Sequence, residues 1–143
     1  SDNYHLNTNW DLYGKWEGVR DALVKATRNN IDVGAITYLS GSGGSFPYFV
    51  ASGHSSPGTG APRLATGLTT PGWSSYPAFP RVGCFIGICT IAFEGTNTLT
   101  ERLFRERNLR GVGIVVADFP GPSLISAVIG ANRWALGGMN GHA

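Results

Sequence analysis

Apolar residues near the N-terminus recur every three or four positions, which is the spacing of one face of an amphipathic helix. The positions concerned are Leu12, Trp16, Val19, Leu23 and Ala26. Asp21 and Lys25 fall on the outer side, and Thr8 or Asn9 is placed to cap the N-terminus. This pattern predicts a first helix over about residues 9 to 28.

Two runs of β-branched and small apolar residues predict strands. The first spans residues 31 to 40 and enters a glycine-rich turn at residues 41 to 44. The second begins at Val112 and stops on Asp118, after which proline, glycine and a helical pattern follow. Such a strand-loop-helix unit is typical of a parallel sheet. The fold class we expect is therefore α/β with parallel strands.

Asp118 stands at the predicted C-terminal end of its strand. In α/β folds, functional residues collect at the carboxyl ends of the strands. A carboxylate at this position could orient a histidine, bind substrate hydroxyls or hold a metal. The alternative is that Asp118 caps the helix that begins at Ser123 or Leu124.

Two further helices flank the second strand. Thr98 and Glu101 have the spacing of a capping box, and Gly111 follows where that helix is expected to end. Pro122 suits a first helical turn, and an apolar helix face follows it. That face comprises Leu124, Ile125, Val128 and Ile129. Residues 134 to 143 are predicted to be irregular. Because two strands do not form a stable parallel sheet alone, we expect more strands, and the first residues look like the end of one.

The chain from about residue 41 to 95 shows no sustained periodicity, apart from an apolar patch near residues 84 to 93, and holds six of the eight prolines. We expect a long elaborated loop there. Its cysteines, Cys84 and Cys89, have no neighbouring histidine to complete a zinc site, and we predict no metal site in this chain. A short-loop disulfide and two buried thiols are the alternatives, and we favour the disulfide.

Composition narrows the class of protein. With 143 residues there is room for one ordinary domain, and 42% hydrophobic against 14% charged residues suits an extracellular protein better than a cytosolic one. A formal net charge of +2 without a Lys/Arg run argues against a nucleic-acid partner. No apolar run reaches the length of a spanning helix, so we expect a soluble secreted domain whose signal lies upstream.

Several segments, taken in order, resemble the C-terminal half of microbial phosphatidylinositol-specific phospholipase C. They are SDNY at residues 1 to 4, TNWD at 8 to 11, YLSGSGGSFPYFVASG at 38 to 53 and RGVGIVVADFPGPSLISAVIGAN at 110 to 132. The resemblance implies a distorted TIM-type (β/α) barrel. Residues 1 to 143 would be the C-terminal part of this one domain, and an N-terminal half would be needed to close the barrel.

The resemblance also implies a reaction. The inositol 2-hydroxyl attacks phosphorus, which releases diacylglycerol and a cyclic inositol phosphate, with one histidine as general base and another as general acid. An arginine or a calcium ion neutralises the phosphate. The family's base histidine lies in a Gly-Thr-His-Asp type segment that this chain lacks, and His5, His54 and His142 match neither catalytic histidine. The chain alone is therefore expected to be inactive and to hold no cofactor, and calcium would belong to the complete enzyme.

A few residues match family positions. Asp118 matches the strand-end aspartate that pairs with the general-base histidine, where it would fix the tautomer and stabilise the imidazolium. Asp2 matches a carboxylate that accepts hydrogen bonds from inositol hydroxyls, and Tyr4 matches an aromatic that lies against the inositol ring. The alternatives are a turn residue for Asp2 and a core ring for Tyr4.

Three aromatic residues match the rim that meets the lipid interface in this family, namely Phe46, Tyr48 and Phe49. Core packing is the alternative, and it is equally good for Tyr48 and Phe49. The expected partner is an inositol phospholipid or a glycosylated inositol lipid at a membrane surface. Two other functions stay open: a non-catalytic glycan- or inositol-binding module on the same fold, and a small secreted protein that acts only by interfacial binding.

Overall fold

The structure, a computed structural model, describes residues 3–28, 34–58, 60–67, 76, 79 and 81–137. The elements in chain order are β1 (His5–Leu6), α1 (Asp11–Arg28), β2 (Ile36–Tyr38), β3 (Ser42–Gly43), α2 (Pro47–Ser52), β4 (Leu64–Gly67), β5 (Arg81–Phe85), β6 (Ile88–Ala92), α3 (Thr96–Glu106), β7 (Ile114–Val116) and α4 (Pro122–Gly137).

The two strands predicted from β-branched runs pair in parallel. Ile36 of β2 lies opposite Ile114 of β7, and Tyr38 lies opposite Val116. The amide of Leu39 extends the ladder by donating to the carbonyl of Val116 at 2.8 Å. The predicted parallel pairing is confirmed, although both strands are shorter than expected.

The first strand begins further along the chain than expected, at His5. β1 follows Tyr4 and pairs in parallel with β3, with His5 opposite Ser42. The interpretation of residues 1 to 4 as a strand terminus is therefore wrong for Tyr4, which precedes a strand. Asp2 lies outside the described residues.

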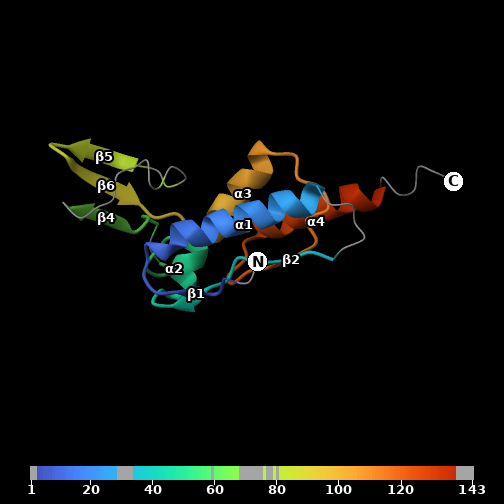
Figure 1. Cartoon of the computed structure of the whole chain (residues 1–143), viewed down its shortest axis with the longest axis horizontal. Coiled ribbons are helices and arrows are strands. Elements are labelled where there is room, and N and C mark those ends of the chain that lie inside the picture. Colours follow the sequence, from blue (N-terminus) through green and yellow to red (C-terminus); the bar gives the residue numbers. More distant parts are fainter. Residues whose placement is uncertain are drawn as a thin grey trace.

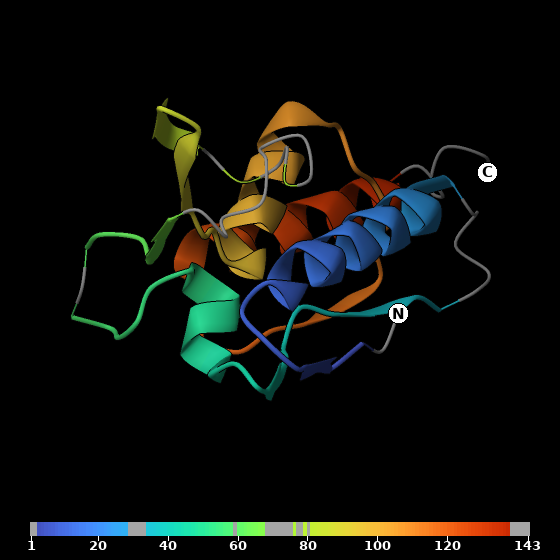
Figure 2. The ribbon, with the colours of Figure 1, turned by 60° about the vertical axis from the view of Figure 1, so that its left-hand side comes forward.

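Helices cover one face of the β2–β7 pair. Figure 2 shows α1 and α4 on the same side of the extended β2 and β7 segments. Thr37 and Leu39 are buried toward this side, whereas Ile36 and Ile114 on the opposite face are 47% and 61% exposed. The described chain is thus mixed α/β with small parallel sheets, and its described strands do not close into a barrel.

The helix boundaries agree with the sequence patterns in part. α1 is confirmed, but its N-terminus is fixed by Asp11, whose carboxylate accepts hydrogen bonds from the amides of Asn7 and Thr8 at 2.7 and 3.1 Å. α4 begins at Pro122 as predicted and continues to Gly137, so the first residues of the tail are helical and not irregular.

α3 begins before the predicted capping box. Its N-cap is Gly95 and its first residue is Thr96, whose buried hydroxyl lies 2.9 Å from the carbonyl of Leu39 and 3.2 Å from that of Val50. This hydroxyl ties α3 to the end of β2 and to α2. The expected Thr98–Glu101 start is therefore wrong, because a tertiary contact of Thr96 fixes the helix end.

The segment from 41 to 95, expected to be one long loop, contains regular structure. α2 is a short helix that ends at Gly53 in a left-handed conformation with φ of 76°. Beyond it, β4, β6 and β5 form an antiparallel sheet in that spatial order. A disulfide joins Cys84 and Cys89 on neighbouring strands, which confirms the favoured pairing. Figure 1 shows this sheet at one end of the molecule, away from α4.

Candidate functional site

Asp118 is the predicted catalytic residue, and it lies two residues beyond the end of β7. Its side chain is half-buried, and its carboxylate forms no hydrogen bond or ion pair with any residue that the structure describes. It therefore neither caps α4 nor is neutralised within the described chain. A carboxylate in this state is available to accept hydrogen bonds from a ligand or from another protein segment.

Asn97 holds the backbone on which Asp118 stands. Its buried side-chain amide donates to the carbonyl of Asp118 at 2.8 Å and lies 3.3 Å from the carbonyl of Phe119. The other amide atom, Oδ1, is buried without a partner among the described residues. Sequence reasoning missed this residue, because an asparagine in the first turn of a helix carries no signal for a distant loop.

Phe119 takes an unusual backbone conformation directly after Asp118. Its φ of 49° lies in the left-handed region, which residues other than glycine and asparagine rarely occupy. Such conformations cost about 1–3 kcal/mol and gather at functional sites. The Phe119 ring is exposed and meets the Tyr48 ring edge to face, with centroids 5.4 Å apart. Tyr48 of α2 thereby lies beside the Asp118 loop.

The other two proposed rim aromatics have opposite environments. Phe46, at the N-cap of α2, is 78% exposed, as a membrane contact requires. Phe49 is 2% exposed and packs edge to face against Phe93. The guanidinium of Arg63 lies 5.7 Å from the centroid of the Phe49 ring. The interface role predicted for Phe49 is therefore wrong, because this ring belongs to the core.

Tyr4 lies near the end of β2. Its side chain is exposed, and its carbonyl accepts a hydrogen bond from the amide of Ser42 at 2.8 Å. Buried Lys15 fixes this arrangement by donating to the carbonyls of Asn3 and Tyr38 at 2.8 and 2.9 Å. The structure thus places Tyr4 and Asp118 at the C-terminal end of the parallel pair. Sequence reasoning missed Lys15, whose position on the apolar face of α1 was its only signal.

The described histidines lie neither on β7 nor on the loop that carries Asp118. His5 belongs to β1, and His54 follows the C-cap of α2, while His142 is outside the described residues. Across the part of the chain that the structure describes, His, Cys, Asp and Glu side chains form no group of three or more that could hold a metal.

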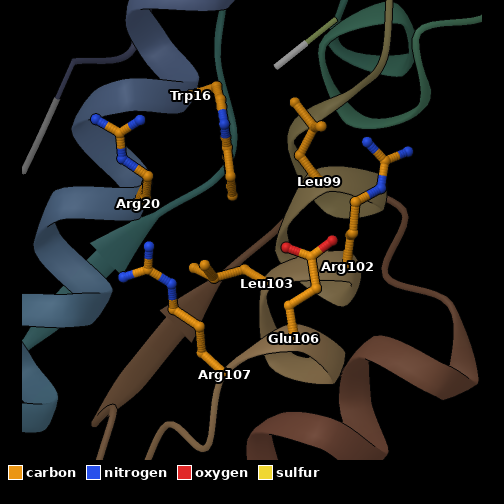
Figure 3. A pocket seen from close by; sticks show the side chains of 7 residues that line it. All are labelled: Trp16, Arg20, Leu99, Arg102, Leu103, Glu106 and Arg107. Atoms are coloured by element: carbon orange, nitrogen blue, oxygen red, sulfur yellow. The ribbon is translucent and has the colours of Figure 1, made fainter. Parts of the chain in front are cut away.

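A concave region also lies between α1 and α3, with a volume of about 290 Å³. Figure 3 shows Arg107 reaching from the end of α3 toward α1, with Trp16 and Leu103 between the two helices. Other arginines of this region are paired: Arg102 with Glu94 at 2.6 Å, and Arg20 with Asp21 at 3.0 Å. Because these carboxylates neutralise much of the positive charge, the Asp118 end of the sheet is the stronger candidate site.

None of the helices in the described ranges is long and apolar enough to cross a membrane. No protein-family model, curated protein or solved structure matches this chain.

Proposed function

We propose that this chain is the C-terminal part of a secreted phosphodiesterase that resembles phosphatidylinositol-specific phospholipase C. The observation that carries the proposal is the half-buried Asp118 carboxylate, which stands beyond a parallel strand without a partner among the described residues. Asn97 holds the backbone of Asp118, and the next residue, Phe119, has a strained left-handed backbone conformation. The Cys84–Cys89 disulfide supports an oxidising compartment outside the cytosol.

The uncovered face of the β2–β7 pair supports an N-terminal half that closes a barrel. Parallel sheets are normally covered on both faces, yet Ile36, Ile114 and Val116 are 47%, 61% and 37% exposed. Next to this pair, an apolar cavity of about 210 Å³ lies between β7 and α4, lined by Val115 and Leu124 among others. Further strands and helices of a (β/α) barrel would cover such surfaces.

In the complete enzyme, Asp118 would accept a hydrogen bond from the general-base histidine supplied by the N-terminal half. The carboxylate would hold the imidazole in the reactive tautomer and stabilise the imidazolium formed when the inositol 2-hydroxyl is deprotonated. Tyr4 would lie against the inositol ring, and Asp2 would accept hydrogen bonds from its hydroxyls. An arginine or a calcium ion outside this chain would neutralise the phosphate.

A non-catalytic glycan- or inositol-binding module is the second candidate. The observation that favours it is the contact between the Tyr48 and Phe119 rings beside the loop that carries Asp118, since a carboxylate and aromatic rings are groups that bind polyols. Such a module needs no histidine pair.

The first test is the mass and activity of the natural protein that contains this chain. We expect a mass near twice 15.1 kDa, counting both halves if the chain is nicked, and release of cyclic inositol phosphate from phosphatidylinositol vesicles. A natural protein of the mass of this chain alone, without hydrolysis but with inositol binding by calorimetry, would favour the binding module.

A further inference from the structure

The turn between β5 and β6 presents large apolar side chains to solvent. Phe85 is 78% exposed, Ile86 82% and Ile88 40%. Figure 1 shows that the hairpin forms an extremity of the molecule, at the left of the view and away from the helices. Among the described residues, β4 pairs with β6 from Ala92 back to Cys89, and no described residue of β4 pairs with residues 85 to 88.

The tip is held rigidly. Cys84 and Cys89 lie opposite each other in the strand register and are joined by the disulfide, directly before and after residues 85 to 88. Inside this clamp, Phe85 pairs with Ile88. The short covalent loop keeps the apolar side chains together at the tip, because the disulfide prevents the two strands from separating there.

Ile86 occupies a position that favours other residues. Its φ is 50° and that of Gly87 is 75°, and positive φ at both central residues is the pattern of a type I′ turn. Asparagine, aspartate or glycine is preferred at the first position, whereas a β-branched residue is strained there. An isoleucine that is strained and 82% exposed stabilises neither the turn nor the core. Its apolar side chain is therefore suited to a contact outside this chain.

The charges in the sequence on either side of the hairpin indicate the nature of that contact. From Val33 to Phe93 the sequence contains no aspartate or glutamate, and its only basic residues are His54, Arg63 and Arg81. Carboxylates are repelled by phosphate-rich surfaces, and arginines are attracted to them. An apolar tip on a segment without acidic residues complements an anionic lipid surface.

We propose that the tip formed by Phe85, Ile86 and Ile88 inserts into the headgroup boundary of a lipid bilayer and anchors the protein there. A narrow convex tip without polar side chains suits fluid acyl chains, which adapt to any shape, whereas a protein partner would need a matching pocket. The anchoring does not depend on the proposed hydrolysis, because vesicle binding is measured without turnover.

The test is sedimentation of the 143-residue chain with vesicles of phosphatidylcholine, alone and mixed with phosphatidylserine. We expect the wild-type chain to sediment with the mixed vesicles. Ile86→Asn removes the apolar side chain but suits the type I′ turn, so it should keep or raise the melting temperature while weakening partitioning by about tenfold or more. Phe85→Ser should weaken partitioning by a similar factor.

Ile129→Ser is the matched control, because Ile129 is 47% exposed on α4, away from the hairpin. It should leave vesicle partitioning unchanged. Equal losses for Ile86→Asn and Ile129→Ser would overturn the proposal, since general surface hydrophobicity would then explain binding. An Ile86→Asn chain that binds like wild type would also overturn it. A wild-type chain that stays in the supernatant with both vesicle types would reject the bilayer and leave a protein pocket as the occupant.

Discussion

The side-chain amide of Asn97 donates a hydrogen bond to the backbone carbonyl of Asp118 at 2.8 Å. This bond joins the first turn of α3 to the loop that follows β7, and the two residues are 21 positions apart in the sequence. The position of the Asp118 backbone is therefore set by a partly buried contact from another helix. The carboxylate on this fixed backbone has no described partner, so it is open to a hydrogen bond with another group.

Replacing Asp118 with asparagine should abolish most turnover in the complete enzyme and leave the fold nearly unchanged. The asparagine keeps the shape but removes the charge that orients the base histidine, and loss of the equivalent partner in serine proteases costs about 10⁴ in turnover. Substrate affinity should change little. The measurement is release of cyclic inositol phosphate, with Glu106→Gln on α3 as the control. Activity of the Asp118→Asn variant within about threefold of wild type would reject the assignment, since that is under about 1 kcal/mol of barrier.

Asn97→Ala should destabilise the protein without touching the Asp118 side chain. The carbonyls of Asp118 and Phe119 would lose their donor in a partly buried place, which costs about 1–3 kcal/mol in the free energy of unfolding. Urea denaturation measures this loss. The control is Asn108→Ala, an exposed position that should change stability by no more than about 0.5 kcal/mol. Equal stabilities of the two variants would contradict the role given to Asn97.

Sequence patterns predicted the elements whose signals are local. The apolar face of α1, the proline that begins α4 and the β-branched runs of β2 and β7 each follow from residues within one element. The antiparallel sheet of β4, β6 and β5 was missed because its strands are short and lack clear alternation. Leu64, for example, pairs with Ala92, and no local pattern announces a partner so far along the chain.

The candidate site was predictable only where one residue carries its own signal. Asp118 ends an apolar run and was proposed for that reason, whereas Lys15 and Asn97 act through carbonyls brought near them by the fold. Lys15 contacts the carbonyl of Tyr38, which is 23 positions away. Phe49 and its neighbour Tyr48 could not be distinguished from the sequence, because both stand in the same apolar context. In the structure, Tyr48 is more exposed than Phe49.

Phe46 and Phe49 should respond oppositely to truncation. Phe46→Ser should weaken vesicle binding by about 1.5–3 kcal/mol and leave the melting temperature unchanged, because the ring is 78% exposed. Phe49→Ala should lower the free energy of unfolding by about 3–5 kcal/mol, because it opens a cavity in the core. Vesicle sedimentation and thermal melting separate the two effects. A lowered melting temperature for Phe46→Ser with unchanged vesicle binding would show that Phe46 packs inward.

Ile114→Ser should have different effects in the isolated chain and in the complete natural protein. In the chain, Ile114 is 61% exposed, so the free energy of unfolding should change by no more than about 0.5 kcal/mol. If an N-terminal half closes a barrel over β2 and β7, the same side chain is buried in the complete protein. Its loss should then lower the free energy of unfolding of that protein by about 1.5–3 kcal/mol.

The matched control for this comparison is Leu39→Ala. Leu39 is fully buried on the helix-covered face, so its truncation should lower the free energy of unfolding by about 2–5 kcal/mol in both proteins. Urea denaturation of the two proteins with each variant gives the comparison. A small effect of Ile114→Ser in both would mean that this face stays open in the complete protein. The barrel, and with it the delivery of a histidine to Asp118 from its other half, would then be wrong, because a closed barrel would bury this face in its interior.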